Sequence, residues 1–160
     1  MTDTRQIDVV TLRLGGERIA IPATLLREIV EPVPVTRVPT ANPFSKGLVN
    51  VRGSVVPLTD LRVPFRMPAA EMTADTRFIV LDLTVDDAPL TVAITADKVE
   101  TVSPLDPGQI DPIPEVGTLW PPDFVRGICK LDQDFVLLPD LHRIFQAFSA
   151  PGDHRKDFSK

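Results

Sequence analysis

Residues 47–65, GLVNVRGSVVPLTDLRVPF, form the stretch that decides the fold of this chain. Two short apolar runs flank Arg52-Gly53, and the glycine favours the tight turn of a β-hairpin between them. A short helical turn is expected to begin at Thr59 or Asp60. Arg52 places a charge at the tip of an otherwise apolar hairpin, so its side chain must be solvated, paired within the fold or offered to a partner.

The overall composition is that of a globular protein. The chain has 160 residues, of which 43% are hydrophobic and 24% charged, enough for one domain or two small subdomains. Its formal net charge of −5 argues against nucleic acid and anionic membranes as partners. With a single cysteine no internal disulfide can form, which fits a reducing compartment. The chain shows no signal peptide and no apolar segment of about 20 residues, which predicts a cytoplasmic protein without direct membrane insertion.

Hairpin patterns continue on both sides of the opening stretch. Strand-like runs joined by glycine or polar pairs predict three further hairpins. Their turns are expected at Gly15-Gly16, Asp86-Asp87 and Asp132-Gln133. Prolines leave room only for a short edge strand over residues 35–38, and the proline-rich residues 103–122 predict a long surface loop.

Two short helices are predicted. One covers residues 23–29, where Leu25, Leu26 and Ile29 share an apolar face. The other is a C-terminal helix capped by Asp140, behind which apolar side chains recur at helical spacing. Many short strands with so few helices indicate an all-β domain, either a barrel or a sandwich.

Short blocks of the sequence recur in the same order. The blocks are residues 56–61 and 136–141 (with Phe65 and Phe145 beyond them), Val51-Arg52-Gly53 and Val125-Arg126-Gly127, and residues 28–32 and 100–104. The first pair lies 80 positions apart, the second 74 and the third 72. This repeat predicts two similar β subdomains that share an interface, with a groove between them. Because Arg52 recurs as Arg126, part of its expected role is to form a turn.

Side chains at the spacing of a catalytic or metal site are not found in the sequence. His142 and His154 have no second ligand at metal spacing, and Cys129 has no partner cysteine. No serine lies in a nucleophile elbow, and no glycine-rich stretch has the lysine of a phosphate loop. We therefore predict no catalytic residues, no metal, no cofactor and no enzymatic activity.

Several blocks together carry a resemblance to a known family. They are Glu28-Ile29, Lys46-Gly47-Leu48-Val49-Asn50-Val51-Arg52-Gly53, Val56-Pro57-Leu58-Thr59-Asp60-Leu61-Arg62, Ala96-Asp97-x-Val99-x-x-Val102, and the last hairpin with its helix. In these blocks the chain resembles the CheW-type adaptors, the coupling proteins of bacterial chemotaxis. The match runs from about Val9 to Phe148 and is most specific between Gly47 and Arg62.

The resemblance implies an all-β fold of two small five-stranded β-barrels packed together, with short helices including a C-terminal one. A single domain is expected over residues 1–150, with interleaved subdomains at roughly 10–75 and 76–148 and a flexible tail at 151–160. It also implies a non-catalytic scaffold. Such a scaffold couples the cytoplasmic tips of methyl-accepting chemoreceptors to the regulatory domain of a chemotaxis histidine kinase.

The resemblance further implies two binding surfaces. A receptor helix is expected in the apolar groove between the subdomains, where the matching positions are Leu26, Glu28, Gly47, Arg52, Val99 and Val102. The kinase is expected near Val35, Arg37 and Val38. Glu28 is the expected partner of Arg52, because a guanidinium can bind a carboxylate and still offer donors to a ligand.

One departure and two alternatives accompany this interpretation. At Asp111 and Val116 the family often has a basic and an aromatic residue that contact the kinase, and Asp111 reverses that charge.

A small β-barrel that binds a ligand as a sensor is a different class of function for the same pattern. The same adaptor chemistry would also serve a pathway other than flagellar chemotaxis, such as surface motility.

Overall fold

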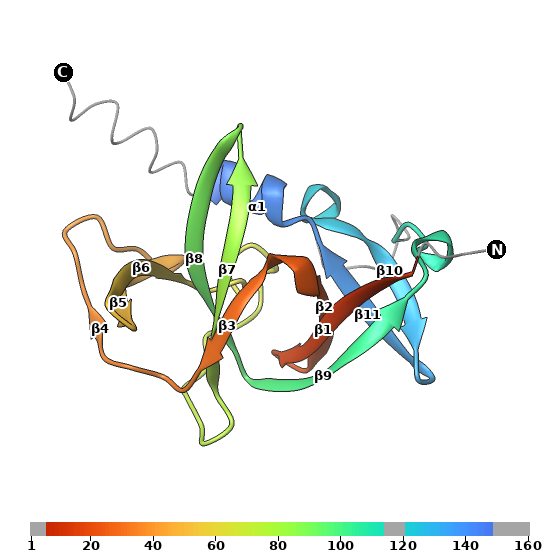
Figure 1. Ribbon diagram of the computed structural model, residues 1–160, viewed down its shortest axis with the longest axis horizontal. Helices are drawn as coiled ribbons and strands as arrows, with labels where there is room; N and C mark the ends of the chain where they lie inside the picture. Colours follow the sequence, from red (N-terminus) through yellow and green to blue (C-terminus); the bar gives the residue numbers. More distant parts are fainter. Residues whose placement is uncertain (1–5, 114–120, 149–160) are drawn as a thin grey trace.

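The computed structural model describes residues 6–113 and 121–148 of the chain. These residues form two neighbouring β-sheets and a single α-helix, α1 (Leu141–Phe148) (Figure 1). The predicted β fold with a short C-terminal helix is therefore confirmed, whereas the predicted tail at 151–160 lies outside the described residues.

The first sheet uses strands from both ends of the described chain, and we call it the terminal sheet. Its order is β10-β11-β2-β1-β9. Its strands are β1 (Ile7–Leu14), β2 (Glu17–Pro22), β9 (Lys98–Leu105), β10 (Val125–Leu131) and β11 (Asp134–Pro139). All neighbours are antiparallel except β11 and β2, which run parallel.

The second sheet, here the middle sheet, takes the strands between. Its order is β3-β7-β8-β6-β5-β4. Its strands are β3 (Leu26–Val30), β4 (Val35–Thr36), β5 (Ser45–Val51), β6 (Ser54–Thr59), β7 (Arg77–Val85) and β8 (Ala88–Ala96). Its one parallel pair is β6 with β8. The strands of the two sheets are thus interleaved along the chain, and neither sheet corresponds to residues 10–75 or 76–148 alone.

All four predicted hairpin turns are confirmed. Each turn consists of two residues in the left-handed region, the geometry that suits the twist of a tight hairpin. The pairs are Gly15-Gly16 (φ 59° and 85°), Arg52-Gly53 (52° and 86°), Asp86-Asp87 (53° and 65°) and Asp132-Gln133 (53° and 72°). Aspartate and glycine tolerate this region well, which is why these turns could be predicted from the sequence.

The helix predicted over residues 23–29 is wrong. Only a 3-10 turn, η1 (Ala23–Leu25), is present, and the chain then extends into β3. In β3, Leu26, Glu28 and Val30 are half-buried while the residues between them are exposed, which is the two-residue period of a strand. Pairing of β3 with β7 therefore overrides the apolar stripe that suggested a helix.

The long loop predicted over residues 103–122 is only partly present. Strand β9 continues to Leu105, and a 3-10 turn, η2 (Pro107–Gln109), follows it. Beyond η2, Asp111 forms an isolated antiparallel bridge with Ile128 of β10. A third 3-10 turn, η3 (Pro122–Phe124), leads into β10. The predicted edge strand at 35–38 is confirmed as β4, shortened to two residues.

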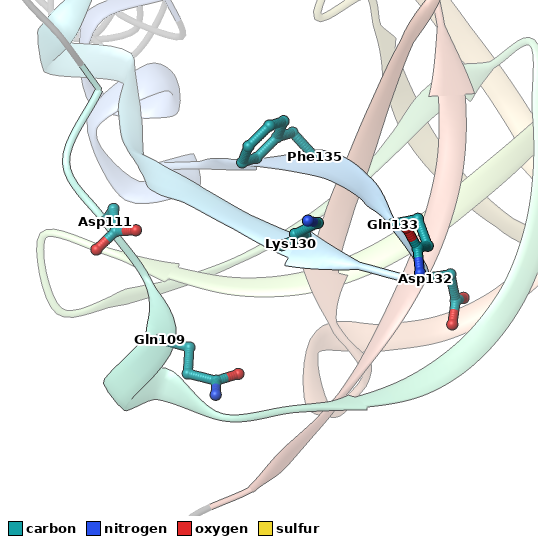
Figure 2. A pocket seen from close by; sticks show the side chains of 6 residues that line it. All are labelled: Gln109, Asp111, Lys130, Asp132, Gln133 and Phe135. Atoms are coloured by element: carbon teal, nitrogen blue, oxygen red, sulfur yellow. The ribbon is translucent and has the colours of Figure 1, made fainter.

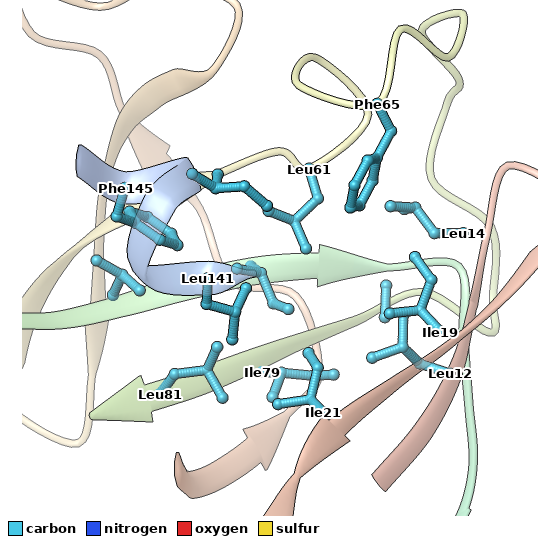
Figure 3. Close-up of a cluster of buried hydrophobic side chains, with 14 of the residues drawn as sticks. Leu12, Leu14, Ile19, Ile21, Leu61, Phe65, Ile79, Leu81, Leu141 and Phe145 are labelled. Atoms are coloured by element: carbon cyan, nitrogen blue, oxygen red, sulfur yellow. The ribbon is translucent and has the colours of Figure 1, made fainter. Parts of the chain in front are cut away.

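The main core lies between the two sheets and beneath α1 (Figure 3). Leu12, Leu14, Ile19 and Ile21 enter it from the terminal sheet, and residues of β7, the turn after β6 and α1 enter from the other side. The labelled side chains of this second group are Leu61, Phe65, Ile79, Leu81, Leu141 and Phe145. The shared interface predicted from the internal repeat is therefore present, and it is apolar.

The internal repeat is real, but one block of it was aligned in the wrong register. Strands β5 and β6 recur as β10 and β11 at a constant spacing of 80 residues. Each hairpin has a β-bulge at the same place, before Gly47 and before Gly127. Arg52 therefore corresponds to Asp132 and not to Arg126, so the inference drawn from Arg126 was wrong, although Arg52 does lie in a turn.

Candidate partner-binding surfaces

The predicted pair of Arg52 and Glu28 is present. The Arg52 Nε donates to Glu28 Oε1 at 2.5 Å, which joins the β5–β6 turn to β3. The Arg52 side chain is 77% exposed and that of Glu28 only 22%. Asn50 fixes the turn itself, because its Oδ1 accepts a hydrogen bond from Gly53 N at 2.9 Å. The arginine is therefore held in place from below while its charged group faces solvent.

Leu26 and Val99 lie on edge strands of different sheets, β3 and β9. Both are half-buried and pack against the main core from opposite sheets. The remaining predicted groove residue of β9, Val102, is 59% exposed, and Ile29 of β3 is 38% exposed. Each of these two is an exposed apolar side chain on an edge strand, which a partner can cover.

Gly47 has a role within the fold. A Cβ atom added there would lie 2.4 Å from Thr36 O and 3.0 Å from Val35 Cγ1, so β4 crosses directly over this residue. The absence of a side chain at Gly47 is required by the close approach of β4. The atoms nearest to an added Cβ at Gly47 all belong to β4, and the Arg52–Glu28 hydrogen bond joins the β5–β6 turn to β3.

The three residues predicted for the kinase surface lie on and just after β4, at the edge of the middle sheet. Val35 is half-buried and packs against a small core formed by β5, β6, β7 and β8. Arg37 is exposed, and Val38 is half-buried with its carbonyl accepting from Ala41 N at 2.9 Å. Arg37 is thus the residue of this group whose side chain is most available to a partner.

An open hollow of about 690 Å³ lies between the β10–β11 hairpin of the terminal sheet and the segment around η2 (Figure 2). Its lining residues are Gln109, Asp111, Lys130, Asp132, Gln133 and Phe135. Asp111 thus lies in this hollow, while Val116 lies outside the described residues. Phe135 is 66% exposed and was missed by sequence reasoning, because alternation along Asp134-Phe135-Val136 does not say which face meets solvent.

The described residues hold no cluster of three or more metal-ligating side chains. Cys129 is buried, and burial raises the pKa of its thiol. Among the same residues, no helix has the length and apolar character needed to cross a bilayer.

A model of the CheW-like domain matches residues 8–149 of the chain. The chain belongs to the CheW family. The chemotaxis protein CheW of Klebsiella aerogenes is 31% identical over 134 residues, covering 84% of this chain and 78% of that protein. The probable chemotaxis protein CheW of Rhizobium etli is 27% identical over 138 residues, covering 86% of each chain.

The CheW fold is also matched by a crystal structure. The scaffolding protein TtCheW from Thermoanaerobacter tengcongensis superposes with a TM-score of 0.77 at 27% identity, covering 91% of this chain and 92% of that one. CheW proteins are scaffolds and not enzymes, so this chain has a non-catalytic adaptor role in chemotaxis.

Proposed function

We propose that the chain couples the cytoplasmic tips of chemoreceptors to the regulatory domain of a chemotaxis histidine kinase, within the cytoplasm. The observation that carries this proposal is the Arg52–Glu28 pair, which holds an exposed guanidinium beside the edge strand β3. Its bond to Glu28 uses Nε, and a guanidinium has two further nitrogens that can donate to a receptor.

The receptor surface is proposed to lie along the edges of β3 and β9. The exposed Val102, with the half-buried Leu26 and Val99, supplies the apolar area that an amphipathic receptor helix can dehydrate. Arg52 would add a directional polar contact at the rim of this surface. Gly47 supports it indirectly, by allowing β4 to pack closely on β5.

The kinase surface is proposed at the β4 edge of the middle sheet, around Val35, Arg37 and Val38. The exposed Arg37, just after β4, offers ionic contacts to a partner domain.

Closure of each sheet into a small barrel is part of the same proposal. In the terminal sheet, the Asp111–Ile128 bridge brings the segment after edge strand β9 onto the opposite edge strand, β10. In the middle sheet, the edge strands β3 and β4 are joined by only residues 31–34. Barrels that remove free edges are a common solution for small sheets.

The Arg52→Ala variant tests the function. We expect its affinity for a receptor signalling-tip fragment to fall by about thirtyfold or more, as for a binding hot spot. Because the ion pair is exposed, the unfolding free energy should change by at most about 1 kcal/mol. Affinity is measured by titration of the purified fragment, and stability by thermal unfolding.

Arg126→Ala is the matched control, because Arg126 is an exposed arginine of β10 that belongs to neither proposed surface. It should bind the receptor tip as the parent chain does. Unchanged affinity of Arg52→Ala would contradict the proposal, and parallel loss of folding and binding would assign Arg52 a structural role only.

A further inference from the structure

The turn after β6 contains a buried arginine that the proposed function does not use. Arg62 is 3% exposed, and its Nη2 donates to Asp97 Oδ1. Its Nη1 lies 3.5 Å from Asp60 Oδ1, and its backbone N–H donates to the same oxygen at 3.0 Å. Within the described part of the chain, Nε is buried with no hydrogen-bond partner. Such burial of a charge is costly unless the charge is paired and hydrogen-bonded.

The partner of Arg62 occupies the crossover between the sheets. Asp97 follows β8, the last strand of the middle sheet, and precedes β9, the edge of the terminal sheet. Its second carboxylate oxygen, Oδ2, accepts from Gly15 N at 2.8 Å, and its backbone N–H donates to Arg13 O at 2.9 Å. One carboxylate therefore joins the Arg62 turn, the β8–β9 crossover and the β1–β2 turn.

The chain passes between the sheets at a second crossover that is built differently. From β2 to β3 the connection is η1, where Leu25 packs against the main core. This apolar crossover leads directly into β3, whereas the ionic one leads directly into β9. The connections that lead into the two edge strands, and so to Leu26 and Val99, are thus one apolar and one ionic.

The ionic connection is not duplicated in the repeat. At the spacing of 80 residues the counterpart of Arg62 is His142, which is exposed on α1 and lies 3.2 Å from Thr84 O through Nδ1. The repeat therefore does not require a buried arginine at this place. A role confined to one crossover explains why only one copy has it.

We infer that Arg62 and Asp97 are positioning residues for receptor recognition, fixing β9 at the spacing from β3 that the receptor helix requires. This inference rests on the proposed function, since it concerns the same two edge strands. Neither side chain needs to touch the receptor. Loss of the ionic crossover should let β9 shift relative to β3 while β4 and the kinase surface keep their place in the middle sheet.

The Arg62→Lys and Asp97→Asn variants provide the test. Lysine keeps the charge but loses the guanidinium fork, and asparagine keeps an acceptor for Gly15 N but loses the charge. Each should weaken binding of the receptor-tip fragment by about 2- to 30-fold, the range of energetic coupling through a packed network. Binding of the kinase regulatory domain should stay unchanged.

The spacing of the two edges is measured by spin labels. Cysteines replace the exposed Arg27 of β3 and Thr101 of β9 in a Cys129→Ala background, without receptor. Arg62→Lys should shift or broaden the label–label distance distribution relative to the parent chain. Val136→Ala, in the small core within the terminal sheet and outside the main core between the sheets, is the matched destabilised control and should leave both distance and receptor affinity unchanged.

The outcomes separate the two proposals. If the parent chain and Arg126→Ala bind the receptor tip but Arg62→Lys and Asp97→Asn bind it equally well, the positioning role is overturned and the proposed function stands. Weakened binding with an unchanged label distance, or weakened binding in Val136→Ala as well, also overturns it, because stability alone then explains the loss. A parent chain that does not bind the tip overturns both.

Discussion

Gly47 and Gly127 lie 80 residues apart at equivalent places in the two sheets, each beneath a backbone carbonyl of a crossing segment. The Cβ positions are 2.4 Å from Thr36 O at Gly47 and 2.5 Å from Asp111 O at Gly127. The same close approach therefore fixes β4 over β5 in one sheet and the Asp111 bridge over β10 in the other.

Replacing either glycine by alanine should destabilise the protein. A methyl group at Gly47 or Gly127 must push backbone aside, and overpacking of this kind costs about 1–3 kcal/mol. The unfolding free energy from urea titration measures the effect.

Gly108→Ala is the control for this prediction. Its nearest atom outside the adjoining residues is the side-chain Asp106 Oδ1 at 3.3 Å, so its stability should stay within about 0.5 kcal/mol of the parent chain. Equal stabilities for Gly47→Ala and Gly108→Ala would show that β4 is free to move away.

Exchange of the charges of Arg52 and Glu28 separates recognition from structure. A double-mutant cycle compares the unfolding free energies of the single and double variants by chemical denaturation. The Arg52→Glu/Glu28→Arg double variant should regain the small coupling free energy of an exposed ion pair, about 0–1 kcal/mol. Binding of the receptor tip should not recover, because the exposed guanidinium has moved to β3. Recovered binding in the double variant would mean that only the pairing matters.

Stability should depend on pH through Glu100 of β9. Burial alone would raise the pKa of the Glu100 carboxyl, but hydrogen bonds from Arg13 and Arg18, each at 2.8 Å, lower it below its ordinary value of 4.5. The carboxylate therefore stabilises the folded chain fully above the unfolded pKa. This contribution is lost as the pH falls through the lower folded-state pKa.

Glu100→Gln should therefore lower the free energy of unfolding by about 1–3 kcal/mol near neutral pH. The difference in unfolding free energy from the parent chain should shrink below about pH 4.5. Urea unfolding across this pH range measures it. Glu71→Gln, on the exposed linker, should behave as the parent chain at every pH. A Glu100→Gln deficit that persists undiminished in acid would show that the carboxylate charge is not its source.

The cap of α1 can be tested at Asp140. Its Oδ1 accepts from Arg143 N at 3.1 Å, and its carbonyl accepts from Ile144 N at 3.0 Å. Asp140→Ala should lower stability by about 0.5–2 kcal/mol, whereas Asp140→Asn should retain most of the cap. Thermal unfolding of the two variants compares them, and equal losses would contradict a capping role for the side chain.

Much of the fold was predictable because the residues at each turn determine its backbone conformation locally. Each hairpin needed two left-handed residues, and Gly15-Gly16 or Asp86-Asp87 indicate this without any tertiary information. The helix wrongly assigned to residues 23–29 failed for the opposite reason. Pairing with β7, some fifty residues later in the chain, decides the conformation of β3, and no local pattern contains it.

The site was predictable only where it is local or follows from the family resemblance. Glu28 and Arg52 were expected to pair and do so. The buried Arg62 was passed over because its partner Asp97 lies at a crossover between sheets, and sequence spacing gives no sign of that contact. Phe135 was missed because the alternation of side chains along a strand shows which residues share a face but not which face is exposed to solvent.

The placement of β1 between β2 and β9 has a consequence for how the protein is made. A nascent chain that has emerged only as far as β8 can complete the middle sheet, because all of its strands have then been synthesised. The β1–β2 hairpin must wait for residues about ninety positions downstream before it gains either neighbour. Such distant pairings slow folding and leave edges unprotected. On the ribosome, the sheet that contains the first strand is therefore the last to form.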